Sequence, residues 1–377
     1  MSTATDTVPA SGAYEPGSHP DLAPPPGTTG PIRWMKDNLF SSPLSTVLTL
    51  ISVYIVYTVV TSAGSWLVLD AVISADSREA CQAIDSGACW AVIVSRFNLS
   101  IYGFYPDAER WRLNLAFILL FVALGPILFD NFPARKHMMK FSMAYPVIAY
   151  FLVVGGMGLE PVSTHLFGGV MLTLVIGLTG ITCSLPIGIL LALGRYSKLP
   201  VMRMVCTMFI EFIRGVSLIA LLFVASVMLN YFLPPGVEFD LLFRVLIMVT
   251  FFASAYMAEV IRGGLQSMPK GQFEAADAMG LTYWQAMRLI ILPQALKVSI
   301  PGIVNTFIGL YKDTTLVLII GLLDVLGIMR SSLADPKWNG LAHEVYLYTA
   351  IFFFISCFAM SRSSLYLERK LHTGHKR

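Results

Sequence analysis

The chain has 377 residues, of which 56% are hydrophobic and 13% charged, with a mean hydropathy of +0.69 and a net charge of +3. Soluble domains carry about 25% charged residues, and several apolar runs here reach the ~20 residues that span a bilayer. The composition therefore predicts an all-α polytopic membrane protein rather than a soluble domain. No long basic run interleaved with aromatic residues indicates a nucleic-acid partner.

The first 31 residues are rich in Pro, Ser, Thr, Gly and Ala. Such a composition cannot bury a core, so residues 1–31 are expected to form a disordered tail. The tail lacks a basic region followed directly by an apolar stretch and a cleavage site, which argues against a signal peptide. Arg33 and Lys36 precede the first apolar run, and the positive-inside rule places them in the cytoplasm together with the tail.

Eight apolar runs are long enough to be transmembrane helices. They cover, approximately, residues 44–69, 113–130, 143–160, 168–193, 205–230, 239–261, 297–322 and 345–361. Arg135, Lys136 and Lys140 indicate a cytoplasmic turn, and the tail that begins at Arg362 is basic as well. An even number of spans puts both termini inside. Residues 70–112 then form a long polar outer loop, whose arginines weigh little because the loop is long.

The stretch Glu274–Pro293 is the most polar and most helix-patterned segment between the apolar runs. Residues 274–279 are good helix formers, and Gly280 suits the left-handed residue that ends a helix. Thr282, with Gln285 three residues later, fits a capping box that begins a second helix. The stretch therefore predicts two short cytoplasmic helices joined by a hinge, with an acidic edge suited to a groove in a partner.

Six residues of this stretch carry a recognisable motif: Glu274, Ala275, Ala276, Gly280, Leu292 and Pro293. Their spacing resembles the EAA loop of ABC-importer permeases, and the preceding run, Ala258 to Gln272, is similar to the polar amino-acid branch of that family. The resemblance implies that the loop docks on a separate ATP-hydrolysing subunit, with Glu274 and Gly280 as the residues that couple the two. The alternative is an ordinary amphipathic connector.

The resemblance covers about residues 168–370, which hold five of the spans. It implies three parts: a cytoplasmic tail (1–31), an extension with three transmembrane helices and an outer loop (32–166), and an ABC-importer (MetI-like) permease core (167–377) with its coupling loop at 262–294. An extension of this sort resembles the permease subunits of broad-range L-amino-acid importers. The family commonly has Arg-Gly-Thr-Pro where this chain has Arg214-Gly215-Val216-Ser217, and the absent proline argues against a break in that helix.

Several catalytic signatures are absent from the sequence. There is no G-x-x-x-x-G-K-[ST] phosphate-binding loop, no H-E-x-x-H and no G-x-S-x-G, and the six His are scattered. The chain is therefore expected to be a transporter subunit rather than an enzyme, without a metal site or cofactor of its own. If ATP drives transport, ATP and Mg bind to a partner subunit.

The cysteines allow one structural prediction. Cys81 and Cys89 lie eight residues apart in the outer loop, where an oxidising compartment would allow a disulfide. The alternative is a pair of free thiols in a loosely ordered loop.

Ionisable residues within apolar runs are costly and often indicate a transport path or an ion pair. The candidates for a substrate path are Glu211, Arg214, Glu259, Asp313 and Thr314. An amino acid would need a cation for its carboxylate and a carboxylate for its ammonium. Alternatively, Glu211–Arg214 and Glu259–Arg262 are i,i+3 pairs that neutralise themselves.

Together these observations predict a transmembrane subunit of a binding-protein-dependent ABC importer that moves L-amino acids of broad range across a bacterial inner membrane. Its expected partners are ABC ATPase subunits, a second and unlike permease, a periplasmic amino-acid-binding protein and membrane lipid. Two alternatives remain open: a self-sufficient secondary transporter or channel, which would leave the EAA loop unexplained, and a membrane scaffold, which would leave the charged spans unexplained.

Overall fold

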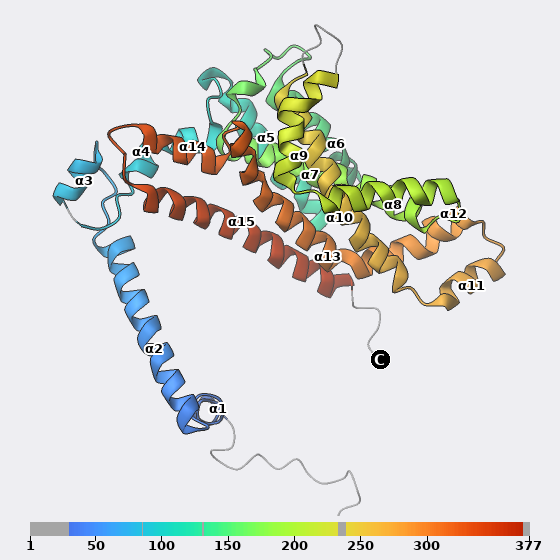
Figure 1. Ribbon diagram of the computed structural model, residues 1–377, viewed down its shortest axis with the longest axis horizontal. Helices are drawn as coiled ribbons and strands as arrows, with labels where there is room; N and C mark the ends of the chain where they lie inside the picture. Colours follow the sequence, from blue (N-terminus) through green and yellow to red (C-terminus); the bar gives the residue numbers. More distant parts are fainter. Residues whose placement is uncertain (1–29, 85, 130–131, 233–238, 372–377) are drawn as a thin grey trace, which may run out of the picture. The chain divides into compact units, whose positions relative to one another are not determined.

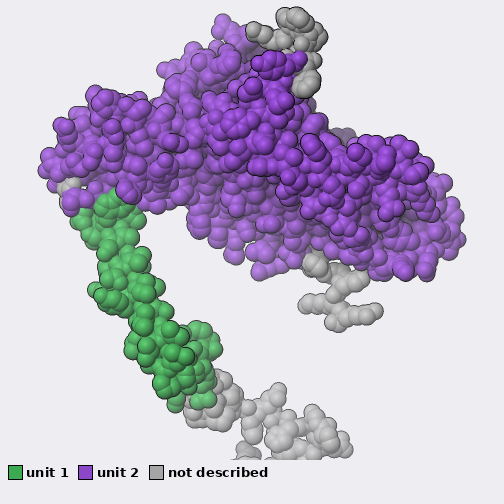
Figure 2. Space-filling view, viewed as in Figure 1, with its two compact units in different colours: residues 1–71 green, residues 72–377 purple. Residues whose placement is uncertain are grey.

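A computed structural model describes residues 30–84, 86–129, 132–232 and 239–371 (Figure 1). The expected disordered tail, except for its last two residues, lies outside the described residues. The described part of the chain consists of helices, with no strands. Two compact units are distinguished in Figure 2, residues 1–71 and residues 72–377.

The first unit contains one membrane span. α1 (Pro31–Asn38) is followed by α2 (Pro43–Gly64), which the π-helical turn η1 (Ser65–Leu69) extends. Ser42 caps α2 by accepting a hydrogen bond from the Ser45 backbone N–H at 3.1 Å. None of the residues of α2 is buried, as expected of a helix whose side chains face lipid.

The second unit contains the remaining spans. The continuous ones are α5 (Arg110–Leu128) with the 3-10 turn η2 (Asp107–Glu109), α6 (Arg135–Val154), α7 (Gly169–Tyr196), α10 (Leu241–Gln266), α13 (Leu292–Asp313) and α15 (Ala342–Leu371). Together with α2, the described residues contain seven helices long and apolar enough to cross a membrane, or eight spans with one bent pair. The prediction of eight spans is thus confirmed with one of them broken. The third span was predicted at about 143–160, whereas α6 begins at Arg135. Arg135, Lys136 and Lys140 therefore lie in the helix rather than in a turn.

The broken span corrects an expectation from the sequence. α8 (Pro200–Gly215) and α9 (Leu218–Phe223), which continues into the π-helical turn η4 (Val224–Met228), meet at an angle of 101°. The helix breaks without a proline because Val216 and Ser217 both have extended backbones. Ser217 then begins the next helix, and its carbonyl accepts the Leu221 N–H at 3.2 Å.

The two central helices of the second unit are α7 and α10, which form the most extensive helix pair of the described chain. One apolar cluster includes Leu172 and Val249, and a second, nearer the C-terminal ends of both helices, includes Ile261 and Ile291. Arg244 of α10 is buried and structural, because its Nη1 donates to the carbonyls of Ala225 at 2.9 Å and Ser226 at 2.8 Å.

The described residues between 72 and 105 (72–84 and 86–105) are folded, although the sequence suggested a polar loop. They form α3 (Arg78–Ile84) and α4 (Ala91–Tyr102), and a disulfide joins Cys81 to Cys89. Their apolar side chains pack on the segment between α13 and α15, which holds the 3-10 turn η7 (Thr314–Ile320), α14 (Val325–Ser331) and the 3-10 turn η8 (Ser332–Ala334). These contacts explain why the loop folds.

Polar contacts and a close backbone approach hold α4 in place. Arg96 forms an ion pair with Asp335 at 2.6 Å, and the Cys89 N–H donates to Glu344 Oε1 at 3.2 Å. At the end of α4, a Cβ on Gly103 would lie 2.6 Å from the Cα of Gly168, at the start of α7. Only glycine permits this approach, so the extension is joined directly to the backbone of the core.

Asp324 is a fully buried carboxyl group at the N-cap of α14. Its Oδ1 accepts the Gly327 N–H at 2.9 Å, whereas its Oδ2 has no hydrogen-bond partner among the described residues. Burial raises the pKa of Asp324 from 3.8 to about 6, and the backbone N–H donors oppose this only in part.

Asp324→Asn is expected to remove a pH dependence of stability. A carboxyl whose folded pKa is raised stabilises the fold fully below about pH 4, and this contribution is lost as the pH rises through 6. The contribution at stake is roughly 3 kcal/mol. Asparagine keeps the cap, so the variant should show a flatter apparent Tm between pH 5 and 7.5 than the unmodified chain. Thermal unfolding in detergent measures this, with the exposed Asp107→Asn as the control. An unchanged slope in Asp324→Asn would contradict the assignment.

Candidate functional site

The segment between α10 and α13 forms two short helices, as the sequence predicted. α11 (Lys270–Ala278) and α12 (Tyr283–Ala286) are followed by the π-helical turn η6 (Met287–Ile291), which runs directly into α13. We call residues 270–291 the α11–α12 segment. It lies beside the C-terminal ends of α7 and α10, because Phe273 stacks on Tyr196 of α7 with ring centroids 6.3 Å apart.

The turn between α11 and α12 has a defined backbone. Gly280 has φ +67°, its N–H donates to the Asp277 carbonyl at 3.0 Å, and the Leu281 N–H donates to the Ala276 carbonyl at 3.2 Å. This is the Schellman arrangement, which favours glycine at that position. The Thr282 N–H donates to Gln285 Oε1 at 2.9 Å, as the capping-box pattern predicted. The hinge is therefore held by hydrogen bonds on both sides.

The segment turns one face inward and leaves the other open. Ala276 is buried and Phe273 is partly buried, whereas Glu274 and Ala275 are exposed. Gly280 is also exposed, and a Cβ there would meet nothing within 4 Å. Close approach of the two helices is therefore not what requires glycine at this position. Its positive φ is what requires glycine.

Two large side chains of the segment, one apolar and one aromatic, are also exposed and were not singled out from the sequence. Met279 is 78% exposed and Trp284 is 68% exposed. At the other end of the motif, Leu292 is partly buried against the apolar cluster that includes Ile261 and Ile291. Pro293 lies in the first turn of α13. Proline is tolerated there because it donates no hydrogen bond.

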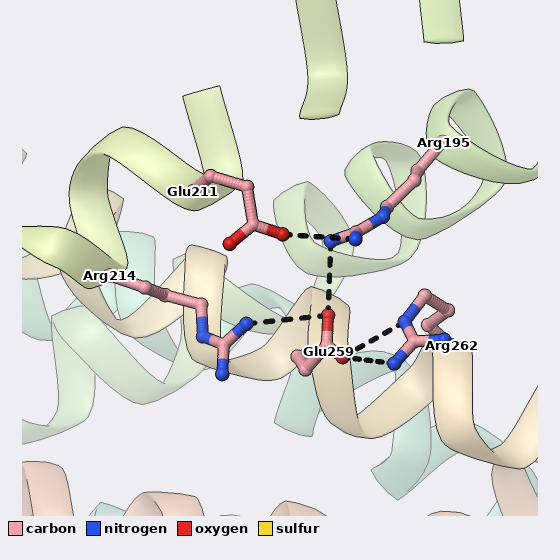
Figure 3. Close-up of polar contacts among 5 residues, drawn as sticks. All are labelled: Arg195, Glu211, Arg214, Glu259 and Arg262. Atoms are coloured by element: carbon pink, nitrogen blue, oxygen red, sulfur yellow. Dashed lines mark hydrogen bonds and ion pairs between the residues drawn. The ribbon is translucent and has the colours of Figure 1, made fainter. Parts of the chain in front are cut away.

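Five charged side chains from three helices form an ionic cluster next to this segment, shown in Figure 3: Arg195, Glu211, Arg214, Glu259 and Arg262. Glu259 is at its centre. Its Oε2 lies 3.1 Å from Arg195 Nη1 and 3.6 Å from Arg214 Nη1, and its Oε1 accepts from Arg262 Nε at 2.9 Å. Arg195 also contacts Glu211, with Nη2 and Oε1 2.9 Å apart.

The structure corrects how these charges pair. Glu259 and Arg262 do form an i,i+3 pair, but Glu259 also binds arginines of α7 and α8. Glu211 and Arg214 do not form the alternative i,i+3 pair, because each binds a residue of another helix. Arg195 was not among the residues predicted for a site. Its role depends on how α7 packs against α8 and α10, which no local pattern reveals.

The cluster carries more cations than anions. Three arginines and two glutamates leave one positive charge in excess (3 − 2 = 1). Arg214 is the least satisfied member, since its Nε is buried without a hydrogen-bond partner among the described residues. Its guanidinium lies 5.7 Å from the centroid of the Tyr256 ring, which supports it from one side. The arrangement could accept one further anionic group.

Asp313 and Thr314 do not belong to this cluster. They lie at the C-terminal end of α13, whereas the α11–α12 segment precedes its N-terminal end. Thr314 is buried, and its hydroxyl donates to the Tyr311 carbonyl at 2.7 Å. Of the residues predicted for a substrate path, the structure thus brings Glu211, Arg214 and Glu259 together in the cluster. The other two, Asp313 and Thr314, lie outside it.

Comparisons with known proteins bear on this geometry. The family described as the binding-protein-dependent transport system inner membrane component matches residues 184–373. The glutamate/glutamine/aspartate/asparagine transport system permease protein BztC of Rhodobacter capsulatus is 44% identical, over 94% of this chain and 98% of that protein. The inner membrane amino-acid ABC transporter permease protein YhdY of Escherichia coli K12 is also 44% identical, over 95% and 97%.

One solved structure, a crystal structure of an amino acid ABC transporter with histidines, is 29% identical and covers 54% of this chain and 92% of its own, with a TM-score of 0.48. The family match and the two full-length relatives confirm the resemblance that the Glu274–Pro293 motif indicated. The chain belongs to the family of binding-protein-dependent inner membrane components and is an amino-acid ABC transporter permease.

Proposed function

We propose that this chain is a permease subunit of an importer that moves L-amino acids of broad range across the bacterial inner membrane. In this proposal a separate ATPase subunit binds ATP and Mg and drives transport, and both termini are cytoplasmic. The observation that carries the proposal is the open side of the α11–α12 segment, on which Glu274, Met279 and Trp284 are all exposed.

This face is suited to docking a soluble subunit. Large apolar side chains exposed next to a charge are typical of interaction sites. Glu274 forms no ion pair with any described residue, so its carboxylate is available to a basic residue of a partner. The Schellman turn and the capping box give the segment a fixed shape. Motion of a docked ATPase would therefore reach α7 through the Phe273–Tyr196 stack.

The ionic cluster supports a substrate route along α8 and α10. Arg214 is the proposed contact for a substrate carboxylate, with Glu211 and Glu259 as counter-charges for an ammonium group. The relative BztC is named for acidic amino acids and their amides, and a cluster with one excess positive charge suits such substrates. Asp313 and Thr314 remain proposed as a separate part of the route.

Two further partners are part of the proposal. α8 exposes Val201, Met204, Met208 and Phe212, an apolar face available to a second permease, which we infer to be an unlike sister subunit. The segment 72–105 and the 332–341 loop packed against it are the proposed contact surface for a periplasmic amino-acid-binding protein. In this topology that surface lies on the opposite side of the membrane from the α11–α12 segment.

Gly280→Asp is expected to abolish ATP-driven uptake while the chain still inserts into the membrane. The space at Gly280 is open in this chain, so an added side chain disturbs chiefly a docked partner. Uptake of a labelled amino acid by membrane vesicles, together with the amount of chain in the membrane, measures this. Gly280→Ala is the matched variant, because its backbone penalty of about 1–2 kcal/mol is at least as large as that of Asp while its side chain is smaller, and it should retain partial uptake. Normal uptake by Gly280→Asp would count against docking at this turn.

Glu274→Lys is expected to prevent recovery of the ATPase subunit. A reversed charge on the open face would repel a basic groove, whereas the fold should be unaffected because Glu274 is exposed. The chain is purified from native membranes in mild detergent, and mass spectrometry identifies what accompanies it. Glu160→Lys, at an exposed carboxylate outside the segment, is the control for the charge change alone. Recovery of the unmodified chain alone, still active in liposomes without ATP, would instead indicate a secondary transporter.

Arg214→Gln is expected to raise the KM for uptake by about 10- to 100-fold, the range of one lost hydrogen bond to a charged group. Arg203→Gln, an exposed arginine of the same helix, should leave the KM unchanged. Transport assays at several substrate concentrations, normalised to the amount of assembled complex, separate the two. A KM that is unchanged in Arg214→Gln, with a lower maximal rate, would assign Arg214 to the structure of the cluster rather than to substrate.

A further inference from the structure

A cavity of about 720 Å³ lies between the α5–α6 hairpin and the core helix α7, with the start of α10 at one end. The hairpin is fastened to the neighbouring loops at that end: the Tyr105 hydroxyl donates to the Val153 carbonyl at 3.0 Å, and Arg112 Nη1 donates to the Glu160 carbonyl at 2.9 Å. Further along the helices the space between hairpin and α7 is lined mostly by apolar side chains, such as Leu120 and Leu178.

The cavity has the depth of one leaflet of a bilayer. Along α7 its lining runs from Met171 to Cys183, and twelve residues of helix rise about 18 Å. Half of a hydrocarbon core of ~30 Å is about 15 Å. Met171 lies near the start of α7, whereas Tyr196 at the end of α7 contacts the α11–α12 segment. The cavity therefore lies in the leaflet remote from that segment.

Physical chemistry restricts what fills such a space. Water is disfavoured between apolar walls within the hydrocarbon region, and an empty space would lose the contacts of every side chain that lines it. The surrounding solvent at this depth consists of acyl chains. An acyl chain is thus the occupant that the lining and the position both favour.

The side chains at the mouth of the cavity indicate which lipid headgroup would bind there. Thr164 and Asp240 line it there and are hydrogen-bonded to each other, and Asp240 Oδ1 caps α10 by accepting the Phe243 N–H at 3.1 Å. Asp240 is exposed, and no Lys, Arg or His among the described residues forms an ion pair with it. The described lining contains no cationic side chain. Such a mouth complements an ammonium group and repels an anionic headgroup.

We propose that this cavity binds one phospholipid with an ethanolamine headgroup. Its ammonium contacts Asp240 and one acyl chain lies along α7 as far as Cys183. The lipid fills the space between the α5–α6 hairpin and the core. It therefore connects the extension to the transport helices at a depth where few side chains of the hairpin contact the core directly.

Native mass spectrometry of the full chain, purified with its partners in mild detergent from nanodiscs of equal phosphatidylethanolamine and phosphatidylglycerol, tests the proposal. The unmodified chain is expected to retain one phosphatidylethanolamine. Thr179→Phe places a ring in the cavity and should lower retention at least fivefold, whereas Leu190→Phe, on an exposed part of the same helix, should not change it.

Asp240→Asn tests the headgroup without emptying the cavity. Asparagine keeps the helix cap, so the fold is preserved while the charge is lost, and the variant should retain both lipids about equally. The proposal is overturned if the unmodified chain retains no phospholipid, if Thr179→Phe retains as much as the unmodified chain, or if Asp240→Asn keeps the preference for phosphatidylethanolamine. A photo-reactive residue at position 179 should crosslink to lipid, and crosslinking to a protein helix instead would assign the cavity to a partner subunit.

Discussion

The arrangement of the C-terminal ends of α7, α8 and α10 depends on one constraint, the pairing of the Glu259 carboxylate. A charge inside a membrane span is costly unless it is paired, and here the pairing requires α7, α8 and α10 to converge, since each contributes an arginine. Removing one partner of such a pair leaves an uncompensated charge, which costs more than the pair itself contributes. The cluster therefore keeps the C-terminal ends of the three helices close together.

A carboxylate with three donors also allows movement. Glu259 can lose the longest of its contacts, the 3.6 Å approach of Arg214, and still be paired with Arg195 and Arg262. A shift of α8 that breaks only the Arg214 contact would therefore leave Glu259 paired, while Glu211 still links α8 to Arg195 of α7. In the proposed transport cycle this property matters, because α7 contacts the α11–α12 segment through Tyr196 and α10 leads directly into it.

Features that depend on local composition could be predicted from the sequence, and features that depend on packing could not. The spans follow from apolar length, and the two short helices follow from Gly280 and the Thr282–Gln285 pair. The break between α8 and α9 was missed because proline was the expected signal, whereas two extended residues suffice. The partners of Glu259 were missed for another reason: Arg195 lies 64 residues away in sequence.

The position of the segment 72–105 is a second feature that the local sequence could not predict. α4 has no strong local signal for its position, yet Arg96, Cys89 and the glycine contact at Gly103 fix it on the segment that joins α13 to α15 and on the start of α7. These contacts hold the helix ends opposite the ionic cluster. The core is thus held at one end by backbone approach and a disulfide-linked segment, and at the other by charges that can exchange partners. Helix ends held by the second kind of contact can move at lower cost, so motion within the core is expected to be larger at the end next to the α11–α12 segment.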